Sequence, residues 1–84
     1  MEDVLIARTD DGQIRVDITD PEYKERFIME DGNLKNIIRS LIEVLDSHKD
    51  NAVDDYERGN NSECERHIYW VNTLISALKI VSAI

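Results

Sequence analysis

The fold is decided by two stretches of the sequence, NLKNIIRSLIEVLDSHKDNAVDDYER (residues 33–58) and NSECERHIYWVNTLISALKIVSAI (residues 61–84). In each, apolar residues recur at intervals of three and four, the spacing that places them on one side of an α-helix. The first stripe consists of Leu34, Ile37, Ile38, Leu41, Ile42, Leu45, His48, Ala52 and Tyr56, and the second of Cys64, Ile68, Val71, Leu74, Ile75, Leu78, Val81 and Ile84. Two such stripes joined by a short break predict a long antiparallel helical hairpin.

The break between the stripes carries residues that end one helix and begin another. Gly59 can adopt the left-handed conformation that closes a helix. Asn60, followed three residues later by Glu63, predicts a capping box at the start of the second helix. Together with Tyr56 and Cys64, these residues resemble the inter-helix turn of a tetratricopeptide repeat. The pattern occurs once in the chain, so we attribute it to helix packing.

Residues 1–19 predict a β-hairpin. An apolar run, Val4–Ala7, and an alternating run, residues 14–18, flank the segment Asp10-Asp11-Gly12-Gln13. An Asp-Gly pair between such runs is a strong hairpin signal, because glycine accepts the positive φ that these turns require. Two strands alone are only marginally stable in water. We therefore expect the hairpin to pack on the helices.

Residues 20–31 allow two interpretations. Asp20 followed by Pro21 is typical of a helix start, with an acidic cap and proline at the first helical position. Tyr23, Phe27 and Ile28 would then share a face. The residues also alternate as a third strand would. We favour the helix and keep the strand as the alternative.

The whole chain is expected to form one α+β, mainly α-helical domain spanning residues 1–84. Its parts are the hairpin (residues 1–19), a short helix or third strand (residues 20–31) and the long helices (residues 33–58 and 61–84). A domain of this size hides only about 60 to 65% of the surface that its unfolded chain exposes. Dimerisation would complete the helical hairpin as a four-helix bundle.

The charge distribution restricts the class of partner. The chain carries 18 acidic and 10 basic residues, a formal net charge of −8, and most of the excess lies in residues 1–31. This sign disfavours direct binding to nucleic acid or to anionic membranes. The start of the chain lacks the basic and then apolar pattern of a secretory signal, and the single cysteine, Cys64, fits a reducing compartment. We expect a cytoplasmic location.

The sequence gives no strong indication of a catalytic or metal-binding site. Cys64 and His67 are three residues apart on one helix, a spacing that permits a thiol and imidazole pair, but Cys64 lies on the apolar stripe and we assign it to packing. His48 is expected near Val71 or Trp70 rather than near His67. A zinc site would need two more ligands. We predict no catalytic, cofactor-binding or metal-binding residues and no enzyme activity.

The predicted function is stoichiometric binding to another protein with a basic surface, as an inhibitor or adaptor of the kind found in phages and small bacterial regulatory loci. The acidic surface is assigned to Asp10, Asp11, Asp17, Asp54, Asp55 and Glu57. An apolar surface for self-association into a homodimer or larger assembly is assigned to Tyr69, Trp70, Ile80 and Ile84, although Trp70 also fits the core. The alternatives are an oligomerisation module working through the last helix, a nucleic-acid mimic, and a thiol or metal enzyme.

Overall fold

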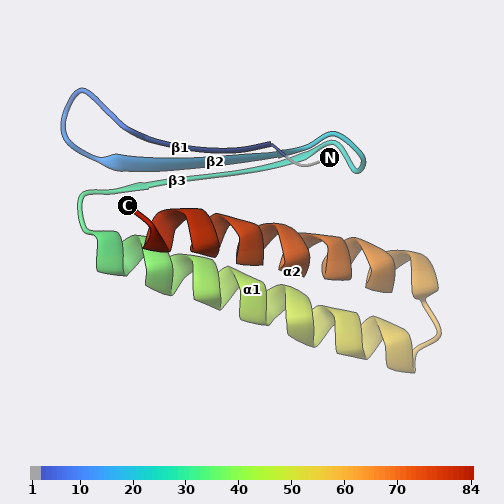
Figure 1. Ribbon diagram of the computed structural model, residues 1–84. Coiled ribbons are helices and arrows are strands. Elements are labelled where there is room, and N and C mark those ends of the chain that lie inside the picture. Colours follow the sequence, from blue (N-terminus) through green and yellow to red (C-terminus); the bar gives the residue numbers. More distant parts are fainter. Residues whose placement is uncertain (1–2) are drawn as a thin grey trace.

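The computed structural model describes residues 3–84 as a three-stranded antiparallel sheet followed by two packed helices (Figure 1). The elements in chain order are β1 (Asp3–Arg8), β2 (Ile14–Asp20), β3 (Glu25–Asp31), α1 (Leu34–Glu57) and α2 (Asn61–Ser82). The predicted α+β fold, with an N-terminal β-hairpin on a helical hairpin, is confirmed. Residues 1 and 2 of the predicted β-hairpin lie outside the described residues.

The turn between β1 and β2 follows the glycine signal. The N–H of Thr9 donates to the carbonyl of Gln13 (2.8 Å), and the N–H of Gly12 donates to the carbonyl of Thr9 (3.0 Å). Gly12 has a φ of 83°. These features define a three-residue hairpin loop in which a type I turn is followed by a left-handed glycine.

The helix favoured for residues 20–31 is wrong, and the third strand is right. β3 pairs antiparallel with β2, from Glu25 opposite Asp20 to Asp31 opposite Ile14. Phe27 and Met29 of β3 are partly buried against the core, and the alternate residues Arg26, Ile28 and Glu30 are exposed. This half-buried alternation favours the strand, because a helix would turn part of the apolar set away from the core.

Asp20 nevertheless makes the hydrogen bonds of a helix cap. Its carboxylate accepts from the backbone N–H groups of Glu22 (2.9 Å) and Tyr23 (3.2 Å), the positions that an N-cap side chain serves. The chain then reverses at Lys24, which has a φ of 57°. Asp20 therefore caps a strand-to-strand turn and not the predicted helix start.

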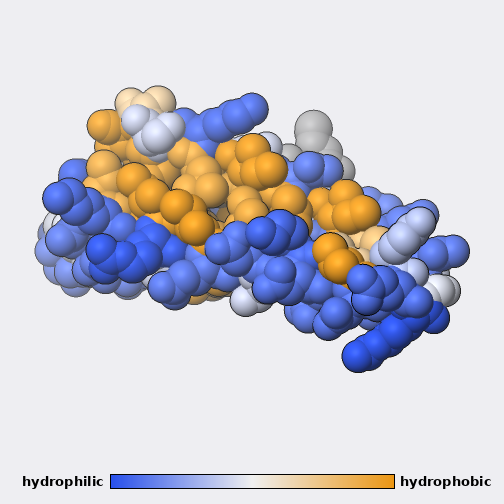
Figure 2. Space-filling view, turned by 90° about the horizontal axis from the view of Figure 1, so that it is seen from below, coloured by the Kyte–Doolittle hydropathy of each residue, from blue (hydrophilic) through white to orange (hydrophobic). Residues whose placement is uncertain are grey.

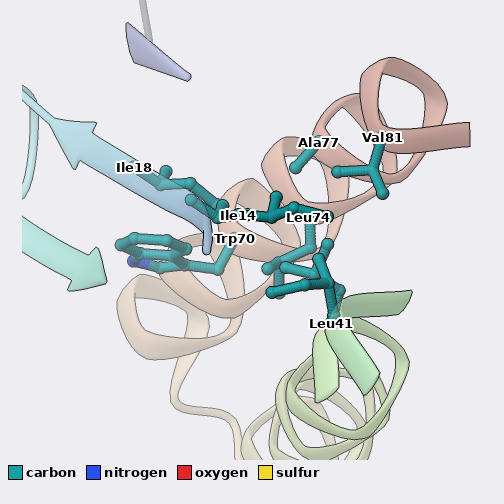
Figure 3. Close-up of a cluster of buried hydrophobic side chains, with 9 residues drawn as sticks. Ile14, Ile18, Leu41, Trp70, Leu74, Ala77 and Val81 are labelled. Atoms are coloured by element: carbon teal, nitrogen blue, oxygen red, sulfur yellow. The ribbon is translucent and has the colours of Figure 1, made fainter. Parts of the chain in front are cut away.

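The core lies between one face of the sheet and the helix pair (Figures 1 and 3). Central strand β2 contributes Ile14, Val16 and Ile18, each at most 2% exposed. The helices complete the cluster with Ile37, Leu41, Trp70, Leu74, Ala77 and Val81. Strand β3 contacts α1 and β1 contacts α2, so the sheet covers one side of both helices.

The turn between the helices differs from the predicted capping box. Gly59 has the expected left-handed φ, 74°. Asn60 occupies the N-cap position, but its side chain makes no capping hydrogen bond. Its backbone N–H already donates to the carbonyl of Asp55 (2.8 Å), so the donor that a capping box would use is taken. Glu63 accepts from Arg66 instead.

Candidate functional site

The side of the helical hairpin opposite the sheet exposes a band of apolar side chains. Figure 2 views the molecule from this side and shows a hydrophobic band bordered by hydrophilic residues. Helical spacing aligns the exposed members on the two helices. We define the distal face by six residues: Ile42, Val53 and Tyr56 of α1, and Ile68, Val71 and Ile75 of α2.

Part of the distal face is hollowed into an apolar groove. The groove has a volume of about 350 Å³ and lies between the helices near their connecting turn. It is lined by Lys49, Ala52, Val53, Tyr56, Cys64, Ile68 and Val71. Tyr56 is 72% exposed and Val53 52%. Fully burying a large apolar side chain contributes about 1.5 to 3 kcal/mol, and these partly exposed side chains realise only a fraction of that contribution.

Charge is distributed unevenly along the hairpin. The half near the connecting turn, residues 46–71, holds seven acidic and three basic residues. Asp55, Glu63 and Arg66 among them are engaged with His67 and Glu25 on the sheet side, which leaves five acidic and two basic residues. The other half, residues 34–45 and 72–84, holds one acidic and three basic residues. We call these the turn half and the open half. The groove lies mostly in the acidic turn half, so a partner with basic groups beside its apolar side chains would match it.

Two histidines meet across the helices on the sheet side of the hairpin. The Nδ1 atoms of His48 and His67 are 2.8 Å apart, which is a hydrogen bond when one of the two nitrogens carries the proton. His48 also stacks on Trp70, with ring centroids 5.8 Å apart and 11° between planes. The prediction that His48 lies near Trp70 is correct, but the exclusion of His67 is wrong. His48 faces α2 at a height between His67 and Trp70, so its ring contacts both residues.

The environment of His48 disfavours its charged form. Burial lowers the pKa of His48 from its ordinary value of 6.5, and the nearby His67 and Arg66 lower it further, while Glu25 acts in the opposite direction. Arg66 donates to Glu25 (2.7 Å) and to Glu63 (2.9 and 3.0 Å). The pair with Glu25 connects α2 to strand β3.

A carboxylate-rich cluster adjoins the histidine pair. Ligand atoms of Asp55, Glu63 and His67 all lie within 4.8 Å of one another, and Nε2 of His67 is 3.6 Å from Oδ2 of Asp55. One imidazole and two carboxylates can bind a divalent cation and leave a position open. The guanidinium of Arg66 on Glu63 opposes a cation there, so we assign the cluster to the joining of α1 and α2.

A second, smaller pocket lies between β3, α1 and α2. Its volume is about 110 Å³, and Glu25, Phe27, Val44, His48 and Trp70 contribute to its lining. The Nε1 atom of Trp70 is buried and makes no hydrogen bond within residues 3–84.

The residues predicted as the acidic surface lie in separate parts of the molecule. Asp10 and Asp11 lie in the β1–β2 turn, at the opposite end of the molecule from Asp54 and Glu57 near the helix turn (Figure 1). Asp17 lies on the outer face of the sheet and accepts from Arg26 at 2.6 and 3.0 Å. Asp55 is turned toward His67.

The residues predicted as an apolar interface lie in different environments, some in the core and some on the surface. Trp70 is 3% exposed and belongs to the core. Tyr69 packs edge-on against Tyr23, with ring centroids 5.5 Å apart. Ile80 and Ile84 are exposed. None of these four residues lines the groove.

Five distal-face residues belong to the predicted apolar stripes, and Val53 lies outside them. The width of the two apolar stripes is the signal that indicates the distal face. When a sheet packs on one edge of a broad apolar stripe, the opposite edge of that stripe remains exposed.

Comparison of the chain with protein-family models, with curated proteins and with solved structures found no match. Within residues 3–84, neither helix has the length and apolar character needed to cross a membrane.

Proposed function

We propose that this chain is a protein-binding protein that acts by stoichiometric association, as an adaptor or inhibitor, and does so without catalysis. Its binding surface is the distal face. The partner is a helical surface with apolar side chains along its middle and basic residues on its flanks.

The observation that carries this proposal is the exposed apolar band on both helices, with a groove between them (Figure 2). Monomeric proteins rarely expose large contiguous apolar patches, and such patches mark interaction sites when polar residues border them. A helix laid into a groove between two helices is a common form of recognition. The acidic character of the turn half supports basic flanks on the partner.

The test uses nuclear magnetic resonance with a defined probe, a synthetic 18-residue amphipathic helix made of leucine and lysine. We expect saturable shifts of backbone amides at the distal face, whether the probe enters a free groove or displaces another occupant. Ile75→Asp should weaken the response. The matched control is Ile28→Asp, because Ile28 has similar exposure (44% against 39%) and lies on the outer face of the sheet. In a monomeric chain, distal-face amides that never respond would contradict the proposal.

A further inference from the structure

The distal face has the shape and charge of a surface that pairs with itself. From these features we propose that its occupant is a second copy of this chain, packed face to face and antiparallel to form a four-helix bundle. This inference rests on the proposed function and names its partner.

The size of the distal face fits a helical hairpin as the occupant. α2 has 22 residues and is therefore about 33 Å long. Helix axes lie about 8 to 10 Å apart, so the whole side of the hairpin, of which the distal face is the apolar part, offers a footprint of about 600 Å². Counted on both copies, this is about 1,200 Å², the lower end of specific protein interfaces. A single docked helix would cover only part of it.

The charges select the direction of packing. A parallel arrangement would place two acidic turn halves against each other, and an antiparallel arrangement places each turn half against an open half with three basic residues and one acidic residue. Opposite charges attract and like charges repel across such an interface. A second copy in the antiparallel orientation therefore supplies the basic flanks that the proposed partner requires.

The antiparallel orientation also brings apolar side chains together. The two-fold axis of this dimer lies in the interface, perpendicular to the helices, and passes the midpoints of α1 and α2. Each helix therefore packs against the same helix of the second copy. About the midpoint of α2 (Asn61–Ser82), Ile68 and Ile75 are symmetrically placed. Ile68 of one copy then lies opposite Ile75 of the other. About the midpoint of α1 (Leu34–Glu57), Val53 lies opposite Ile38 of the second copy, a residue outside the distal face that is partly buried against the core.

The first experiment measures solution mass by light scattering over a range of concentration. We expect the wild-type chain and the control Ile28→Asp to be dimers and Ile75→Asp to be a folded monomer, with folding checked by circular dichroism. A wild-type monomer throughout the range would overturn the inference. A dimer that persists in Ile75→Asp would also overturn it, because the contact would then lie elsewhere.

The second experiment tests the orientation by disulfide formation in a Cys64→Ser background. A mixture of the Ile68→Cys and Ile75→Cys variants should form a cross-linked pair on oxidation. Each variant alone should not, because equivalent residues would be about 10 Å apart along the bundle, beyond disulfide reach. A dimer without cross-linking in the mixture would overturn the antiparallel orientation.

The outcomes for the self-pairing and for the proposed function are distinguishable. A monomer whose distal-face amides respond to the leucine and lysine helix would overturn the self-pairing and support the proposed function. A monomer that does not respond would overturn both. A dimer that loses self-association only in Ile75→Asp would support both.

Discussion

At the residue scale, Asp20 is a carboxylate with no exposed surface that accepts two backbone hydrogen bonds in the β2–β3 turn. Asp20→Ala should lower the free energy of unfolding by about 1 to 3 kcal/mol, because the N–H groups of Glu22 and Tyr23 lose their acceptor. Urea denaturation measures this loss. Asp20→Asn keeps an acceptor oxygen and should cost clearly less; equal losses would mean that the hydrogen bonds are not the cause.

His48 should make stability depend on pH. Its pKa is lowered in the folded state by burial first and then by His67 and Arg66, so the unfolded chain binds more protons near pH 6. Stability therefore rises with pH in this region. The contribution is complete above the unfolded pKa of about 6.5 and is lost as the pH falls through the folded pKa.

Urea midpoints measured from about pH 7.5 to pH 5 test this. The wild-type midpoint should fall toward pH 5, and His48→Gln should fall less steeply. The same slope in both proteins would assign the effect to other groups.

Asp17 provides an internal contrast, because Arg26 lowers its pKa. Its stabilising effect is present above its unfolded pKa of about 3.9 and is lost as the pH falls further.

At the element scale, the turn between the helices depends on the left-handed conformation of Gly59. Gly59→Ala should lower the free energy of unfolding by about 1 to 2 kcal/mol, and backbone strain is the cause because no atom lies within 4 Å of the added methyl group. Gly32→Ala is the control: Gly32 lacks a positive φ, and its nearest neighbour is the flexible side chain of Gln13 at 3.4 Å. Thermal unfolding of both variants gives the comparison, and equal losses would contradict the backbone explanation.

The elements differ in how far the sequence predicts them. The helices and the first hairpin are predictable because their apolar period and the Asp-Gly signal are local properties. The sequence favours a helix for β3 because an Asp-Pro pair makes the same backbone hydrogen bonds in a turn as at the start of a helix. The sequence does not distinguish distal-face residues from core residues, because tertiary packing decides which edge of each apolar stripe the sheet covers. The contact between His48 and His67 likewise depends on the alignment of two helices.

At the scale of the whole molecule, self-pairing couples stability to concentration. A dimer that dissociates on unfolding has a thermal midpoint that rises with protein concentration. Two chains of 84 residues have an unfolding enthalpy of about 120 kcal/mol, so a hundredfold increase in concentration should raise Tm by about 8 °C. Scanning calorimetry measures this shift in the wild-type chain and in Ile28→Asp. Ile75→Asp should melt at a Tm independent of concentration, because its charge would have to enter an apolar interface without a partner. A wild-type Tm that does not change with concentration would mean that the distal face contributes no stability through a second copy.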